Sequence, residues 1–163
     1  MNKKVLYTFI ALTLIVFLTA CGKETKKTAD PNAAFNIECI AAKENGTGID
    51  TDTVVTYSFD DNQYATGYVV TTTQKFNDKS VYQEYKKAQK ETVDGNSEGD
   101  ISYELKSDDK KMTLEFTMII KMNVKDATTD EEKNSLKAST ILKNNKEQKA
   151  TCKVIGIKES EIK

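Results

Sequence analysis

The sequence of 163 residues contains no histidine, no arginine and no tryptophan, and it has a single proline. Without histidine, no side chain titrates near neutral pH at its ordinary pKa, and Ser–His or Cys–His nucleophile pairs cannot form. The most common side-chain ligand for metals is missing as well. Without arginine, no guanidinium can hold a phosphate or a carboxylate in a bidentate geometry. These absences argue against an enzyme, and we expect neither a cofactor nor catalytic residues.

Charge of one sign is not in excess, because 24 lysines are matched by 25 acidic residues and the net charge is -1. Proteins that bind nucleic acids usually carry a basic excess, so this balance argues against a nucleic-acid partner. The length allows one domain plus a leader, and the apolar fraction of 38% allows a modest core.

The first 20 residues have the features of a bacterial secretion signal. Two lysines precede an uncharged, mostly apolar run over residues 5–20, which is shorter than the roughly 20 apolar residues that span a membrane. The run ends in "LTAC", Leu18 to Cys21, which resembles the lipobox of bacterial lipoproteins. The lipobox implies that a dedicated peptidase cleaves between Ala20 and Cys21. It also implies that the Cys21 thiol carries a diacylglycerol with acyl chains such as palmitate.

We therefore expect a mature chain that begins at Cys21 and is held in the cell membrane, facing the extracytoplasmic side. Two acyl chains make a stable anchor, whereas one chain alone holds only marginally. An uncleaved N-terminal anchor and a soluble secreted form are the alternatives. Residues 21–34 follow as a flexible tether, because they are small or polar, include three lysines and show no apolar period.

Assigning Cys21 to the lipid leaves two cysteines, Cys39 and Cys152, in the first and last predicted strands. An exported chain meets an oxidising environment, so we expect these two to form a disulfide. The bridge closes a loop of over a hundred residues, and chain entropy gives it a stabilising effect of about 4–5 kcal/mol. Two buried free thiols are the alternative. A redox-active pair is disfavoured because no C-x-x-C spacing occurs.

Alternation of apolar and polar residues predicts five to six strands. The clearest lies over 111–125, where every second residue from Met112 to Val124 is apolar and the opposite face is mostly polar. Its three methionines share the apolar face, and we expect them in the core rather than in an adaptable binding surface. The other predicted strands cover residues 35–42, 53–59, 64–76, 101–105 and 151–157.

Helical spacing replaces alternation over 80–92, where Val81, Tyr85 and Ala88 recur on one face. A second helix is expected over 129–140, because this segment opens with a T-x-x-E capping box.

The resulting order, β-β-β-α-β-β-α-β, predicts one α+β domain over 35–157, with an antiparallel sheet and helices packed on one face. A short helix is expected over 144–150, and residues 158–163 are expected to form a loose tail.

The segment most similar to a metal site is "DGNSEGD", residues 94–100, which matches the first half of a calcium-binding loop. The position that needs a bidentate glutamate is Leu105, an expected core residue, so we predict no metal site. Acid pairs within 50–52 and 60–61 have the residue type that glycosidases use. They lie in predicted turns, and we expect them to form those turns.

Five threonines suggest a polar sheet face that is either simply solvated or able to bind a partner or a carbohydrate. They are Thr71, Thr72, Thr73, Thr113 and Thr117.

The lipobox and tether occur together with segments whose layout resembles the YehR-like small lipoproteins of bacteria. These segments are "YSFDDNQ", "VYQEYKKAQ", the "ISYEL…MTLEF" hairpin and the late Cys152-Lys153. The resemblance covers nearly the whole mature chain and implies an α+β fold and attachment to the cell envelope. That family has no established activity, so no catalytic residues are carried over.

We accordingly expect a non-enzymatic binding or interaction module of the cell envelope, with an envelope protein or a small ligand as its partner. One alternative is a structural or accessory envelope protein without a small ligand. A hydrolase that uses turn carboxylates is the other.

Overall fold

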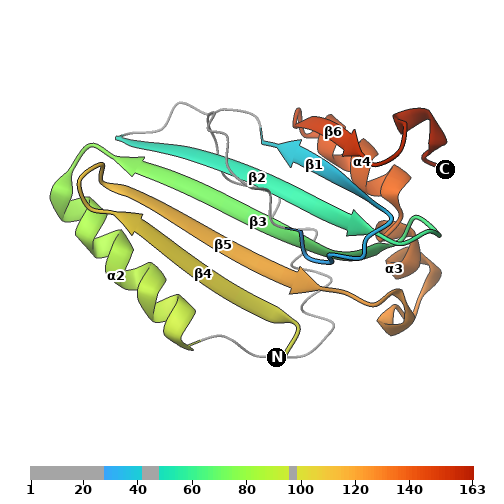
Figure 1. Cartoon of the computed structure of the whole chain (residues 1–163), viewed down its shortest axis with the longest axis horizontal. Helices are drawn as coiled ribbons and strands as arrows, with labels where there is room; N and C mark the ends of the chain where they lie inside the picture. Colours follow the sequence, from blue (N-terminus) through green and yellow to red (C-terminus); the bar gives the residue numbers. More distant parts are fainter. Residues whose placement is uncertain (1–27, 42–47, 96–98) are drawn as a thin grey trace.

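The computed structural model describes residues 28–41, 48–95 and 99–163, and these form one α+β unit (Figure 1). Its strands are β1 (Phe35–Ile40), β2 (Ile49–Phe59), β3 (Ala65–Phe76), β4 (Ile101–Asp108), β5 (Thr113–Lys121) and β6 (Thr151–Ile155). Its helices are α2 (Lys79–Gly95), α3 (Asp130–Ser135) and α4 (Ala138–Glu147), with short 3-10 turns η1 (Val124–Asp126) and η2 (Glu159–Glu161).

The six strands form one antiparallel sheet in the order β4-β5-β3-β2-β1-β6. The expected fold class, including the order of elements, is confirmed. The first strand of the central hairpin begins at Ile49 rather than at residue 53, because it pairs with β3 along nearly its whole length, from Ile49 opposite Phe76 onward. Long-range pairing thus overrides the turn-forming aspartates in this segment.

The main core lies where α4 packs on β1 and β6 (Figure 1). The Phe35 and Phe59 rings stack in it with centroids 4.8 Å apart. Buried Asn145 of α4 donates hydrogen bonds to the carbonyl oxygen of Ile141 at 2.8 Å and to the Tyr57 hydroxyl at 3.4 Å. Burial raises the pKa of Tyr57, so this hydroxyl stays neutral. The buried residues of this main core are Phe35, Ile37, Cys39, Tyr57, Phe59, Ala65, Tyr68, Ile120, Ala138, Ile141 and Leu142.

A second, smaller core lies toward the β4 edge of the sheet, where α2 packs on β3, β4 and β5. It consists of Phe76, Tyr82 and Leu114, all buried. The Gln89 amide of α2 donates to the Gln74 side chain of β3 at 2.7 Å, which ties the helix to the sheet.

Both helices cover the same face of the sheet. Thr51 lies opposite Gln74, which contacts α2, and Tyr57 contacts α4. Thr51 and Tyr57 are an even number of positions apart on β2, so their side chains point to one face.

The predicted helix over 129–140 is wrong in its extent, because two helices occupy this region. The break falls at Leu136 and Lys137, whose backbone pairs with the β2–β3 turn. The Leu136 carbonyl accepts from Ala65 N, and Ala138 N donates to the Gln63 carbonyl, both at 2.9 Å. The capping box at Thr129 and Glu132 is present. The short helix expected over 144–150 is instead the end of α4.

The predicted strand over 111–125 is shorter at both ends. Met112 adopts a φ of 51° in the preceding turn, and Val124 lies in η1, which Asn123 caps. Leu114 and Ile120 are buried as expected, but Phe116 is only half-buried.

The tail expected to be loose is bound to the domain. The Gln63 side chain donates to the Glu161 carbonyl at 2.8 Å and accepts from Lys163 N at 2.7 Å. Ile162 packs against the main core. One glutamine in the β2–β3 turn therefore bonds to two backbone groups of the tail. These contacts have no signal in the local sequence pattern.

The last residues of the expected tether also belong to the folded unit. Ala34 N donates to the Phe59 carbonyl at 2.8 Å, and Ala29 is buried. Ala29 lies so close to Gly67 that a Cβ added there would stand 2.8 Å from the Ala29 Cβ. Glycine at position 67 allows this close approach.

Candidate functional site

The predicted disulfide is present and joins the edge strand β6 to β1. Cys39 and Cys152 lie directly opposite each other in the register, with Cα atoms 4.1 Å apart. Cys39 is only 1% exposed and belongs to the main core. The bridge therefore links the first and last strands of the domain and covers one side of that core.

The lipidation and cleavage site, Ala20 and Cys21, lies outside the described residues, as does the rest of the leader. Within the ranges that the structure describes, no helix has the length and apolarity needed to cross a membrane.

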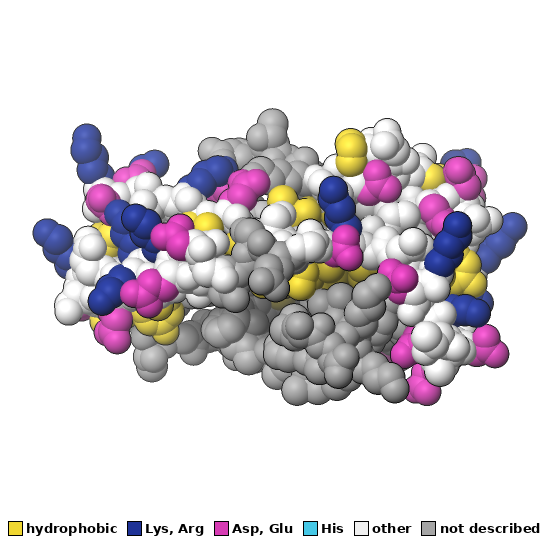
Figure 2. Space-filling view, turned by 90° about the horizontal axis from the view of Figure 1, so that it is seen from below, with side chains coloured by type: hydrophobic (Ala, Val, Ile, Leu, Met, Phe, Trp, Pro, Cys, Tyr) yellow, Lys and Arg dark blue, Asp and Glu magenta, His cyan; other side chains and the backbone are white. Residues whose placement is uncertain are grey.

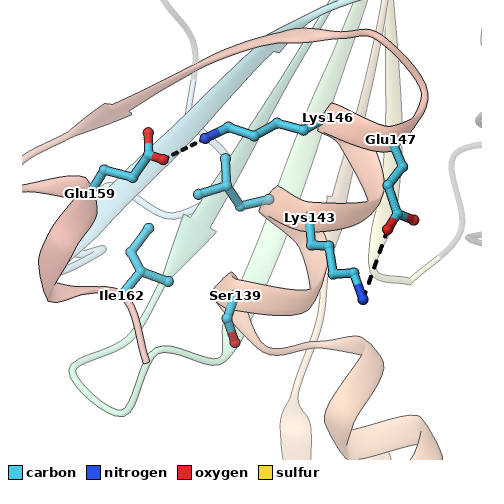
Figure 3. A pocket seen from close by; sticks show the side chains of 7 residues that line it. Ser139, Lys143, Lys146, Glu147, Glu159 and Ile162 are labelled. Carbon is cyan, nitrogen blue, oxygen red and sulfur yellow. Dashed lines mark hydrogen bonds and ion pairs between the residues drawn. The ribbon is translucent and has the colours of Figure 1, made fainter.

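A shallow, open hollow of about 530 Å³ lies between α4 and the C-terminal segment (Figure 3). Leu142 of α4 and Ile162 of the tail supply its apolar lining. Gln63, the packing of Ile162 and the ion pair between Lys146 and Glu159 together hold the tail beside α4, so the two walls come from segments that local sequence patterns do not connect.

Charged side chains of both signs surround this apolar lining. The Lys146 ammonium forms an ion pair with Glu159 of η2, and the Lys143 ammonium lies 3.8 Å from the Glu147 carboxylate (Figure 3). Lys146 and Glu159 are about half exposed, at 47% and 53% of their side chains. A molecule that enters the hollow can therefore replace these weak surface pairs without leaving a buried charge unpaired.

The rest of the charge is spread over the surface. Figure 2 shows lysines and acidic side chains interspersed over the visible face, without a large area of one sign. The electrostatic potentials of the positive and negative side chains on this face therefore largely cancel beyond a Debye length, about 8–10 Å in physiological salt.

One partly exposed cluster, in which only Tyr82 is buried, holds α2 against the β4–β5 turn. The Tyr82 hydroxyl donates to the Asp109 carboxylate, which also accepts from the Lys86 ammonium at 2.6 Å. The hydrogen bond from Lys86, followed by that from Tyr82, lowers the pKa of Asp109, and the same contact raises the pKa of Lys86. The cluster joins two elements of the fold, so we assign it a structural role.

The acid pairs do not assemble into a site among the described residues. Asp50 and Asp52 lie on β2, whereas Asp60 and Asp61 follow its far end. The Asp60 carboxylate accepts from Tyr64 N at 2.8 Å, as expected for a turn residue. The expectation that Asp50 and Asp52 form a turn is wrong, because β2 includes them.

The calcium-like segment is only partly visible, because residues 96–98 lie outside the described ranges. Asp94 and Gly95 end α2, and Gly99 adopts a φ of 64° in the turn before β4. In the described part of the chain, no group of three or more acidic or cysteine side chains could hold a metal ion.

The threonines do not form one solvated face. Thr72 points to the helix-bearing face, where its hydroxyl lies 3.4 Å from that of Thr53, while Thr71 and Thr73 point to the other. Thr117 is only 2% exposed. The expected polar binding face is therefore wrong as a single surface.

Comparison with protein-family models and with curated proteins finds no match for this chain. Among solved structures, the chain is similar to an NMR structure of a protein from Streptococcus pneumoniae TIGR4, with 15% identity and a TM-score of 0.47. The match covers 85% of this chain and 96% of the other. At this level of similarity it supports no inference about function.

Proposed function

We propose that this protein is a non-enzymatic binding module of the bacterial cell envelope, anchored to the extracytoplasmic side of the membrane through lipidated Cys21. The observation that carries the proposal is the disulfide between Cys39 and Cys152, since such bridges persist in exported proteins and are rare in the cytosol. The lipobox at Leu18–Cys21 and the resemblance to YehR-like lipoproteins support the anchor.

The hollow on α4 is the proposed binding site. Its apolar lining, Leu142 and Ile162, suits an apolar group, and the surrounding lysines and glutamates suit a carboxylate and an ammonium. A small zwitterion with an apolar side chain, such as a dipeptide, satisfies all three requirements. We propose this class of molecule as the ligand.

The anchor is tested by replacing Cys21 with serine in the full chain and fractionating the cells. The variant should leave the membrane fraction, whereas a Cys39→Ala/Cys152→Ala variant should stay in it. Membrane retention of Cys21→Ser with a cleaved N terminus would overturn the anchor. Metabolic labelling with a fatty acid gives a matching readout. The Cys21→Ser variant should carry no label, whereas the Cys39→Ala/Cys152→Ala variant should be labelled like the wild type.

The ligand class is tested by thermal shift with a panel of dipeptides and with the corresponding N-acetyl amides, which lack both charges. Dipeptides should raise the melting temperature of the wild type and have no effect on Lys146→Gln/Glu159→Gln. Lys87→Gln, an exposed lysine on α2, is the matched control and should respond like the wild type. Equal shifts in the hollow variant, or no shift in the wild type, would reject the site.

A structural or accessory role without a small ligand is the second candidate. It is favoured by the fact that Lys146 and Glu159 already satisfy each other in the hollow. In that case neither the wild type nor Lys146→Gln/Glu159→Gln should respond to any ligand, and the two proteins should differ only in stability.

A further inference from the structure

The two charge signs are not distributed evenly along this chain. Residues 137–163 hold seven lysines and three glutamates, whereas residues 28–136 hold 12 lysines and 21 acidic residues. The last part of the domain is therefore basic and the rest is acidic, although the whole chain is nearly neutral. A charged surface outside the molecule attracts one of these parts and repels the other.

The topology brings the basic segment to one edge of the sheet. α4, β6 and the tail follow one another in the sequence, β6 is the outermost strand beside β1, and α4 packs on both strands (Figure 1). The face visible in Figure 2 is the one on the β4 side, where the two signs are interspersed. The seven lysines of the β6 side are Lys137, Lys143, Lys146, Lys149, Lys153, Lys158 and Lys163, and all except the half-buried Lys137 are exposed.

Four of these lysines lie close together in the sequence around the turn from α4 to β6. Lys143 and Lys146 are on α4, one turn of helix apart, and each forms an ion pair with a glutamate. Lys149 lies in the α4–β6 turn, where its N–H donates to the Lys146 carbonyl at 2.9 Å. Lys153 is on β6. Lys149 and Lys153 take no part in those two ion pairs, so their charge is available to an outside partner.

We propose that this basic edge, defined by Lys143, Lys146, Lys149 and Lys153, rests on anionic lipid headgroups of the membrane that holds the chain. The proposal builds on the lipid anchor at Cys21. It adds an orientation, because it states which side of the domain faces the bilayer. The binding partner of the edge is a lipid surface rather than a protein or a soluble molecule.

The length of the tether places the edge within reach of the bilayer. Cys21 lies seven residues before Thr28 in the sequence, so at most about 25 Å separates the anchor from the described part of the chain. The chain enters β1 next to the end of β6, since a Cβ added to Gly156 would stand 3.4 Å from the Ala34 carbonyl oxygen. A tether of this length keeps the domain at a high local concentration near the surface, so weak contacts suffice to orient it.

The acidic remainder of the domain does not cancel this attraction. The edge at β4 lies five strand spacings from β6, about 24 Å away. Charges attract a lipid surface only within a Debye length, about 8–10 Å in physiological salt. The distant acidic side chains therefore weaken the contact little, and their repulsion from the same surface turns the β6 edge toward it.

The tether favours lipid over an anionic polymer farther from the membrane. It carries three lysines between Cys21 and Thr28, and basic residues next to a membrane anchor are attracted to anionic headgroups. The two basic parts of the mature chain thus select the same partner.

The basic edge can be tested separately from the hollow. Lys143 and Lys146 line the hollow, whereas Lys149 and Lys153 are not among the residues that line it. Variants of Lys149 and Lys153 therefore probe the lipid contact alone, and failure of the proposed ligand leaves this inference intact.

Co-sedimentation with vesicles tests the lipid contact without the anchor. The protein is the mature chain without its lipid, residues 21–163 with Cys21→Ser, which keeps every described residue. It should bind vesicles of phosphatidylcholine with phosphatidylglycerol, bind phosphatidylcholine alone at least about tenfold more weakly, and dissociate at high salt. Lys149→Gln/Lys153→Gln should weaken binding to the anionic vesicles roughly tenfold, since each lysine near such a surface contributes severalfold.

The matched control changes the net charge equally at the other side of the domain. Lys87→Gln/Lys90→Gln, two exposed lysines on α2, should bind like the parent chain. Lys149→Arg/Lys153→Arg keeps both charges and should also bind like the parent. Equal losses in the two glutamine variants, or equal binding to both kinds of vesicle, would overturn the proposal. Tighter binding to soluble polyphosphate than to anionic vesicles would assign the edge to an anionic polymer and overturn it as well.

Discussion

At one edge of the sheet, β6 is joined to β1 by a disulfide and is backed by the large core under α4. At the other edge, β4 is held by its hydrogen bonds to β5 and by a small core under α2. The closed edge has five residues, whereas the open edge has eight. A covalent bridge thus secures the shorter of these two edge strands, whereas the longer one is held by hydrogen bonds and packing alone.

The largest expected effect comes from removing the bridge at the closed edge. Cys39→Ala/Cys152→Ala should lower the free energy of unfolding by about 4–5 kcal/mol, because the unfolded chain regains the entropy of a loop of this size. Equilibrium denaturation in urea measures it. Cys21→Ser is the matched control and should leave the unfolding midpoint unchanged. A loss below about 1 kcal/mol would mean that strand pairing alone secures β6.

The next effect compares the two cores directly. Phe59→Ala, in the large core, should cost about 3–5 kcal/mol, because its stacked ring is fully buried. Leu114→Ala, in the small core, should cost less, about 2–4 kcal/mol, because a smaller side chain leaves a smaller cavity. Urea denaturation of both variants gives the ranking. A reversed order would show that α2, rather than α4, dominates the stability of the domain.

A smaller effect is expected at the cap of α3, on the closed side. Thr129→Ala removes the side-chain acceptor for Glu132 N at 3.1 Å and should cost about 1 kcal/mol. Thr129→Ser keeps the acceptor and should lie close to the wild type. Thermal unfolding followed by circular dichroism distinguishes the two, and equal losses in both would point to packing of the threonine methyl instead.

The smallest effect is expected at Asp109, on the open side, because exposed ion pairs contribute little. Its lowered pKa means that its contribution is present above the ordinary carboxyl value of 3.8 and is lost as pH falls through the lowered value. Asp109→Asn should therefore be less stable than the wild type at pH 7, and the difference should shrink below pH 3.8. A difference that persists in acid would assign the effect to the Tyr82 hydrogen bond alone.

The sequence predicts the parts of this fold that depend on local periodicity. The alternation around Leu114 and Ile120 places both side chains in the core, and the helical spacing of Val81 and Tyr85 correctly marks α2. The disulfide follows from counting, since assigning Cys21 to a lipid, as the lipobox implies, leaves one pair.

The features that local patterns do not predict depend on contacts distant in sequence. Gln63 bonds to residues about a hundred positions away, so neither the bound tail nor the hollow has a local signal. The break between α3 and α4 arises from Leu136 pairing with the β2–β3 turn rather than from a breaking residue. β2 extends through turn-forming residues because β3 supplies its partner groups.

The bridge between Cys39 and Cys152, 113 positions apart, turns most of the domain into a closed covalent ring. A protease that cuts the backbone once anywhere inside this ring produces two pieces that remain joined through sulfur. The two pieces of the nicked domain therefore stay together, and the N-terminal piece keeps the C-terminal one with it. Release requires two separate events, a backbone cut and reduction of the disulfide.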